Sequence, residues 1–383
     1  GWFFDDLIGT TKKLDYKLTS AKKNNGTWEL NIKNCGEIAA PVCVTAIKDG
    51  KVVKSVWYEG FTGTSSPNFI IADADYFIID QPEDAPEINR KNNIIKTHGI
   101  CKKTEPLRLQ FVGSFDNPTR TQLFFSPVMG FNNYDKFMIG AAFYNHVLPQ
   151  KTFEWVAMPM YSFGSGKVVG HADAFLNFRK CGIFQSIRIG VNANQYNFYK
   201  IQPEDHPADA APDRELMFQK VAPEIGFTFR KKRMRSPISH QIVLRAIWTK
   251  QEYIDVSVDS NSVSWGIGSS EKTFYEAKYM LRNNRNVHPW SLEAKYQQGD
   301  NMSKLSLVAN YTVNYANGKG IHFRFFGGTF LDKGNTGPYR WRMSGYGSRG
   351  LGNHDYLFDH IFLGRSEETG ALGAQFVEQD GAF

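Results

Sequence analysis

The densest group of metal-ligand residue types in this chain lies near its carboxyl end. His354, Asp355, Asp359 and His360 fall within one short stretch, and imidazole and carboxylate groups are ligands that zinc accepts. On a β-strand the two histidines share a face but stand about 20 Å apart, too far to hold one ion. Only a loop could bring them together, so we expect no metal site here.

His171 and Asp173 form a second pair, because alternate residues of a strand point to the same side. We interpret them as the hydrated polar lining of a β-barrel, since the sequence contains no HExxH, no GxSxG and no Walker loop. Residues 345–350 match GxGxxG, but no helix opens after them, as a dinucleotide site would require. We therefore expect no catalytic residue, no metal ligand and no cofactor within this chain.

The elements that carry these polar groups are long strands with regular alternation. In residues 168–178 and 187–194 apolar side chains at every second position oppose polar ones, and the pattern recurs to about residue 313. Such strands exceed the five or six residues usual in soluble sheets. They favour a transmembrane barrel with an apolar lipid face and a polar lumen. The expected lumen-facing polar residues are His171, Asp173, Arg188, Glu224, Arg245 and Glu293.

Aromatic residues make up 14% of the chain, and many stand near the ends of the expected strands. Aromatic side chains are enriched where a membrane meets water. The expected interfacial aromatic residues are Tyr161, Phe178, Tyr196, Trp248 and Trp290.

The sequence pattern predicts an all-β fold: a small β-sandwich followed by an antiparallel transmembrane β-barrel. The chain begins with Gly-Trp rather than Met and stops within a strand-like run, so we expect a piece of a longer protein, with the barrel incomplete at the C-terminus. The expected segments are the end of an upstream helical domain (1–13), the β-sandwich (14–80), a linker rich in turn formers (81–106) and the outer-membrane barrel (107–383).

Charge and hydropathy exclude some classes of protein. The formal net charge is +7, but 45 basic residues are scattered among 38 acidic ones, so we expect no nucleic-acid partner. The densest basic run, residues 230–235, is interpreted as a solvated turn, with anionic lipid headgroups or a partner as the alternative. No run approaches the roughly 18 apolar residues of a spanning helix, and mean hydropathy is −0.40.

The four cysteines form neither a CxxC motif nor a zinc pattern. Cys35 and Cys43 could lie on neighbouring strands close enough to pair in an oxidising compartment, but their spacing does not settle whether they do.

Several motifs resemble a known family. Residues 1–8 (Gly-Trp-Phe-Phe-Asp-Asp-Leu-Ile), 10–17 and 57–61 (Trp-Tyr-Glu-Gly-Phe) resemble the stretch after the catalytic domain of aminopeptidase N-like zinc metallopeptidases of Bacteroidota. Residues 87–93 (Glu-Ile-Asn-Arg-Lys-Asn-Asn) and 356–365 are similar to the barrel region of their large membrane-associated members. The resemblance implies a parent enzyme with zinc in its upstream catalytic domain, if that parent is active. It carries no catalytic or metal residue onto this chain.

Three functions follow, in order of preference. The first is the membrane-anchoring barrel and juxtamembrane sandwich of an outer-membrane metallopeptidase-like protein, with the lipid bilayer of a bacterial outer membrane as its partner. The second is an outer-membrane pore, or a subunit of an outer-membrane protein assembly or export complex with other outer-membrane proteins as partners. The third is a soluble binding module, whose apolar faces would point inward.

Overall fold

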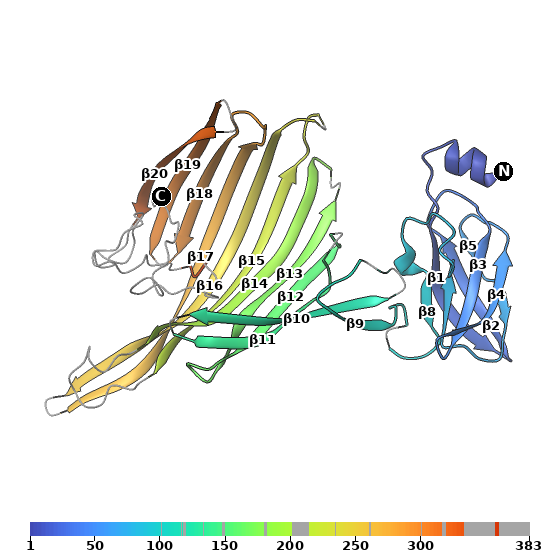
Figure 1. The fold of residues 1–383 in the computed structure, drawn as a ribbon, viewed down its shortest axis with the longest axis horizontal. Coiled ribbons are helices and arrows are strands. Elements are labelled where there is room, and N and C mark those ends of the chain that lie inside the picture. Colours follow the sequence, from blue (N-terminus) through green and yellow to red (C-terminus); the bar gives the residue numbers. More distant parts are fainter. Residues whose placement is uncertain are drawn as a thin grey trace. The chain divides into compact units, whose positions relative to one another are not determined.

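The computed structural model is all-β and is built from antiparallel sheets (Figure 1). It divides into two compact units, Gly1–Leu123 and Phe124–Phe383. No helix in the described ranges has the length and apolar composition that crossing a membrane requires. The described residues are 1–100, 102–115, 117, 120–132, 134–147, 150–179, 182–200, 214–233, 235–259, 262–299, 301–315, 319–332 and 357–359.

The first unit begins with a short helix, η1 (Phe3–Ile8), and contains two four-stranded sheets. The strands are β1 (Tyr16–Asn24), β2 (Thr27–Asn34), β3 (Val42–Lys48), β4 (Lys51–Tyr58), β5 (Thr64–Ser65), β6 (Asn68–Ile70), β7 (Tyr76–Ile79) and β8 (Ile94–Lys96). One sheet is ordered β1-β2-β5 with β6 also paired to β2, and the other is ordered β4-β3-β7-β8. This arrangement is the expected small β-sandwich.

Period-two alternation in the sandwich points its apolar residues into a core. In β2 the side chains of Trp28, Leu30 and Ile32 are only 6%, 0% and 0% exposed, while Glu29 and Lys33, on the other side of the strand, are exposed. Residues of both sheets, among them Leu18, Val44 and Phe77, join this cluster. Burial of apolar surface therefore holds the two sheets together.

The β3–β4 hairpin joins residues 42–48 to residues 51–58. Its two connecting residues, Asp49 and Gly50, have φ angles of 50° and 73°. Two successive left-handed residues are what a two-residue hairpin turn requires, and Asp-Gly is a preferred pair for it.

The predicted linker, 81–106, is in part a component of the sandwich, which corrects the sequence-based boundary. Strand β8 lies within it and extends a sheet beside β7. A short helix, η2 (Arg90–Asn92), precedes that strand. The Asn92 side chain donates to Asp15 Oδ1 at 2.9 Å, and Asn93 donates to the Ile79 carbonyl at 3.3 Å. The sandwich therefore extends at least to β8.

Glu87 is the buried acid of this region. Its carboxylate accepts a hydrogen bond from the Tyr16 backbone N–H at 3.1 Å and another from the Asn93 side-chain amide. Burial nevertheless dominates and raises the pKa of Glu87 to about 7, because a desolvated carboxylate is disfavoured relative to the neutral acid. The sandwich thus contains a carboxyl group that titrates near neutral pH.

The large sheet consists of twelve antiparallel strands in the order β20 to β9, with each strand beside its sequence neighbours. Its strands are β9 (Leu107–Phe111), β10 (Thr121–Asn132), β11 (Lys136–Tyr144), β12 (Phe153–Ser162), β13 (Val168–Arg179), β14 (Phe184–Lys200), β15 (Glu215–Phe229), β16 (Ile238–Asp259), β17 (Ser262–Asn283), β18 (Trp290–Gly299), β19 (Met302–Tyr315) and β20 (Lys319–Asp332).

The long alternating strands predicted from the sequence are confirmed. β16 and β17 each have 22 residues, and at about 3.3 Å per residue a strand of 10 residues already rises 33 Å. The sheet curves along its width (Figure 1). Among the described residues it is an open sheet with β9 and β20 at its edges, and closure into a barrel belongs to the proposal below.

A buried carboxylate at one end of the large sheet links the turn between β10 and β11 to the strands β10, β12 and β14. Asp135 is fully buried and accepts hydrogen bonds from the Asn132 side chain at 2.9 Å and from Asn197 backbone and side-chain N–H groups at 3.1 and 2.5 Å. Its own carbonyl accepts from the Ser162 hydroxyl at 2.8 Å. Charge-assisted hydrogen bonds to a buried carboxylate fix these chain segments together.

Candidate functional site on the polar face of the large sheet

The six predicted lumen-facing residues share one side of the large sheet, which we call the polar face. Residues paired across antiparallel strands lie on the same side. Glu224 on β15 pairs with Arg245 on β16, and Arg245 pairs with Glu276 on β17. The same register connects the residues at positions 171, 173, 188, 224, 245 and 293 through successive pairs from β13 to β18.

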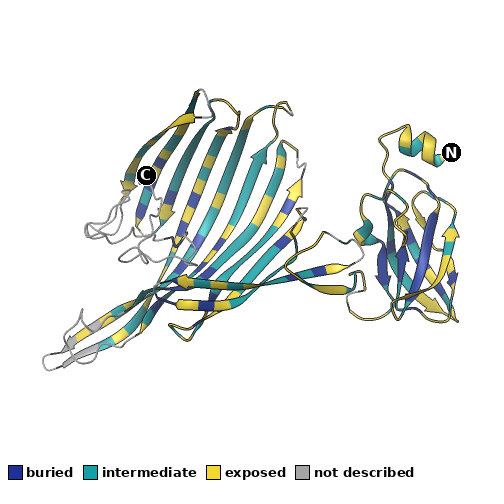
Figure 2. Cartoon of the chain, viewed as in Figure 1, coloured by how far each residue is buried: buried dark blue, intermediate teal, exposed yellow. Residues whose placement is uncertain are grey.

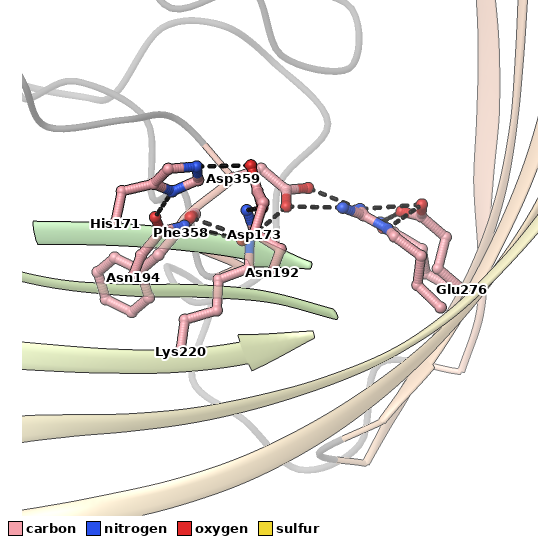
Figure 3. A network of polar contacts seen from close by, with 10 residues as sticks. His171, Asp173, Asn192, Asn194, Lys220, Glu276, Phe358 and Asp359 are labelled. Carbon is pink, nitrogen blue, oxygen red and sulfur yellow. Dashed lines mark hydrogen bonds and ion pairs between the residues drawn. The ribbon is translucent and has the colours of Figure 1, made fainter. Parts of the chain in front are cut away.

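His171 and Asp173 form the first polar cluster on this face (Figure 3). His171 Nε2 lies 2.7 Å from Asp173 Oδ2, and His171 Nδ1 lies 2.5 Å from Asn194 Oδ1. Asn192 donates to the second oxygen of Asp173 at 2.6 Å. Both ring nitrogens are therefore engaged, so the imidazole has no nitrogen left to abstract a proton or to bind a metal ion.

A charged cluster surrounds Asp359, which comes from far along the chain. Lys220 Nζ donates to Asp359 Oδ1 at 2.5 Å and to the Phe358 carbonyl at 3.0 Å. Both terminal nitrogens of Arg245 donate hydrogen bonds to the Asp359 carboxylate, at 2.9 and 2.8 Å. The bidentate pairing of guanidinium with carboxylate is the strongest of the common side-chain ion pairs.

Glu276 on β17 completes this cluster by accepting a hydrogen bond from Arg245. Arg245 Nε donates to Glu276 Oε1 at 3.0 Å, and the Gln297 amide donates to Glu276 Oε2 at 2.5 Å. The four charged groups of Lys220, Arg245, Glu276 and Asp359 sum to zero. Paired charges satisfy the requirement for polar groups buried away from water.

The other predicted polar residues lie on the same face but do not join these clusters. The Arg188 guanidinium lies over the Phe175 ring, 3.6 Å from its centroid. Lys278 and Glu293 form an ion pair at 3.6 Å. The sequence pattern identified the face but not the partners, since it related neither Glu276 nor residues 358–359 to Arg245.

The opposite side of the large sheet, which we call the apolar face, leaves its side chains uncovered by the described residues. In β20, Ile321, Phe323 and Phe325 are 50%, 56% and 63% exposed. Figure 2 shows exposed residues recurring along the long strands. Further exposed members are Phe131, Ile139, Val168, Leu176, Ile189, Val221, Leu244, Tyr275, Leu305, Leu307 and Tyr311.

Four of the five predicted interfacial aromatic residues belong to the apolar face by register: Tyr161, Phe178, Trp248 and Trp290. Tyr196 lies on the polar face instead. Tyr196 pairs with Phe218, is fully buried and packs with Phe358 on the polar face. It has the same parity along β14 as Asn194, so strand alternation outweighs its aromatic character.

The remaining sequence motifs add no site. No metal-binding group of three acidic, histidine or cysteine residues occurs in the described ranges. Of the proposed metal ligands only Asp359 is described, and residues 345–350 lie outside the described part of the chain. Cys35 and Cys43 are free thiols. The described residues of the basic run 230–235 form an exposed connection between β15 and β16.

The fold and this geometry together define an all-β protein whose large sheet has one apolar face and one polar face. A scan against protein-family models and searches of curated proteins and of solved structures returned no match to this chain.

Proposed function

We propose that this chain anchors a larger protein in a bacterial outer membrane, with the large sheet closing into an antiparallel β-barrel whose apolar face contacts lipid. The single observation that supports this most is the exposure of large apolar side chains on one side of the strands β10 to β17, β19 and β20. A soluble protein rarely exposes more than a few hundred Å² of contiguous apolar surface.

Strand length supports the same proposal. The hydrocarbon core of a bilayer is about 30 Å thick, and a tilted strand of about 9–11 residues crosses it. β10 and β12 to β20 have 10 to 22 residues. In hydrocarbon, backbone polar groups must pair within the protein, and only a closed sheet leaves no open edge.

The sandwich is proposed to be the water-exposed, juxtamembrane part. Apolar residues of both its sheets are buried in a shared core, as expected for a unit that folds in water. The resemblance stated above suggests that the anchored domain is a zinc metallopeptidase-like one, carried by a part of the protein outside this sequence.

The test is fractionation of the full-length protein in a bacterium with an outer membrane, together with heat-modifiable mobility in detergent gels. We expect the protein in the outer-membrane fraction and a faster-migrating form before heating. A protein that is soluble and monodisperse without detergent would contradict the proposal, because the apolar face would then have to be covered by protein. A zinc-dependent peptide-cleavage assay on the full-length protein tests the peptidase part.

A second candidate, an outer-membrane pore or a subunit of an assembly or export complex, is favoured by the polar face. Side chains such as His171, Asp173 and Arg188 suit the wall of a hydrated lumen. The position of Phe358 and Asp359 on this face favours an obstructed interior instead. Single-channel recordings in planar bilayers would separate the two, since stable ion conductance is expected only of the pore.

A further inference from the structure

We propose that the polar face of β14 to β17 is a binding site for an aromatic residue followed by an acidic one, and that the chain's own Phe358-Asp359 is its resident ligand. This proposal goes beyond membrane anchoring and does not depend on it. Its parts are a two-cation pocket for the carboxylate and an aromatic pocket for the ring (Figure 3).

The carboxylate pocket consists of Lys220 and Arg245. The Lys220 side chain is only 2% exposed, and its ammonium contacts both Asp359 Oδ1 and the backbone carbonyl of Phe358. Arg245 contacts both carboxylate oxygens. A guanidinium fork matches a carboxylate and not an amide, because an amide presents only one acceptor oxygen. The pocket therefore selects an acidic residue.

The aromatic pocket consists of Phe198 and Phe218. The Phe358 ring stacks on Phe218 with a centroid separation of 3.9 Å and an interplanar angle of 8°. Its second neighbour is Phe198, in an edge contact at 5.6 Å. Stacked and edge-to-face aromatic pairs add stabilisation beyond their buried area. The pocket therefore selects an aromatic side chain immediately before the acid.

The residue before the aromatic one also has a defined place. Leu357 packs into a separate apolar cluster with Ala222, Ile247, Phe274 and Met302. Three consecutive residues of the ligand thus contact three different groups of side chains, which come from β14 to β17 and, through Met302, from β19. A tripeptide with an aliphatic, an aromatic and an acidic side chain in this order matches the whole site.

The site is organised by the sheet rather than by its ligand. Glu276 orients Arg245, and Gln297 orients Glu276, so the fork is held from the side opposite the ligand. The strands that carry the pocket pair with each other over their length. Asp359 of the ligand lies 114 residues from Arg245 and 139 residues from Lys220 in the sequence. A preorganised site loses little conformational freedom on binding, so it can take the same peptide from solution.

The experiment uses the full chain in detergent micelles with the double substitution Phe358→Ala and Asp359→Asn. The probe is the peptide acetyl-Tyr-Leu-Phe-Asp-His-amide, labelled for fluorescence anisotropy. We expect the double variant to bind it roughly tenfold or more tightly than the unsubstituted chain does, since the tethered segment competes at a high effective concentration.

A control peptide with asparagine in place of aspartate measures the carboxylate pocket. It should bind the double variant roughly tenfold less tightly, because charge-assisted hydrogen bonds are lost. Adding Arg245→Lys to the double variant should weaken binding of the aspartate-containing peptide by a similar factor, since lysine cannot form two parallel hydrogen bonds to the carboxylate. Glu293→Gln in the otherwise unchanged chain is the matched control, and it should gain no peptide binding.

Heat-modifiable mobility and circular dichroism confirm that each variant that serves as receptor for the peptide has kept its sheet. If the double variant does not fold, the single variant Asp359→Asn takes its place as receptor. Absence of peptide binding to a folded receptor, or equal binding of the two peptides, would overturn the proposal. Peptide binding by a chain that fails to fractionate with membranes would refute the anchoring function and leave this site standing.

Discussion

The sandwich and the large sheet share a sequence pattern in which apolar and polar residues alternate along each strand. The apolar side is buried in the sandwich and exposed in the large sheet. In β2, alternate apolar residues such as Leu30 are fully buried, whereas in β20 the alternate residues Phe323 and Phe325 are more than half exposed. Alternation fixes which residues share a side of a strand, but it does not state what covers that side. A second sheet covers it in the sandwich, and we propose that lipid covers it in the large sheet.

The largest expected loss of stability comes from a substitution on the buried side of a sandwich strand. Leu30→Lys places an unpaired charge in the sandwich core, and we expect a loss of more than about 4 kcal/mol of stability. Hydrogen exchange of β2 amides in the full chain would report it as loss of protection. The neighbouring Glu29→Lys, on the exposed side of the same strand, is the control and should change protection little. Retained protection in Leu30→Lys would contradict the core assigned to this unit.

The corresponding change on the apolar face separates lipid from water. Leu307→Lys should cost about 2–4 kcal/mol for folding into lipid vesicles, because a lysine near the bilayer midplane is poorly solvated. Val287→Lys is the control, since Val287 is also exposed but lies in the connection between β17 and β18. If the face were in water, both changes would stay within about 0.5 kcal/mol. Urea titration of refolding into vesicles measures the difference.

The pH response of the sandwich is the next effect in size. The unfolded chain releases the Glu87 proton near the ordinary glutamate pKa of 4.5, and burial raises the pKa of Glu87 in the folded chain to about 7. Stability is therefore highest below pH 4.5, falls as pH rises to about 7 and is constant above that, with a total loss of up to about 3 kcal/mol.

Glu87→Gln should flatten this profile and stabilise the sandwich at pH 8, because a neutral amide avoids burial of a charge. Hydrogen exchange of β1 and β2 amides between pH 4 and 8, corrected for intrinsic exchange rates, measures it. A variant that keeps the fall between pH 4.5 and 7 would show that another group is responsible.

The smallest effect concerns the β3–β4 turn. Gly50 has φ of 73°, and a Cβ there would meet no atom within 4 Å. Gly50→Ala should therefore cost only the backbone strain of a left-handed residue, about 1 kcal/mol. Gly26→Ala at the β1–β2 turn, with φ of 80° and equal space, should match it. Exchange of β3 and β2 amides reads out the two turns separately.

Much of the fold could be predicted because it follows from local pattern. Asp49-Gly50 fixed the β3–β4 boundaries, and strand alternation placed Arg188, Glu224 and Arg245 on one face. The extension of the sandwich to β8 was not predicted, since turn-forming residues in 81–93 conceal side chains that bond back to the sheets.

The partners within the site could not be predicted from local pattern. Asp359 reaches Arg245 across 114 residues, and no spacing rule relates positions so far apart. Tyr196 lies on the polar face because strand parity, and not residue type, decides the side to which its ring points. Parity is set by the backbone and holds wherever no bulge intervenes, whereas an aromatic side chain suits either face.

The measurement that tests the central claim most directly is the accessibility of a nitroxide label at Leu307→Cys, in reconstituted vesicles and with the native cysteines replaced by serine. Val53→Cys on β4, an exposed apolar residue of the sandwich, is labelled in parallel. The account predicts that oxygen, which concentrates in lipid, relaxes the label at 307 more than a water-soluble nickel complex does, with the reverse order at 53. Greater access of the nickel complex at both positions would contradict it.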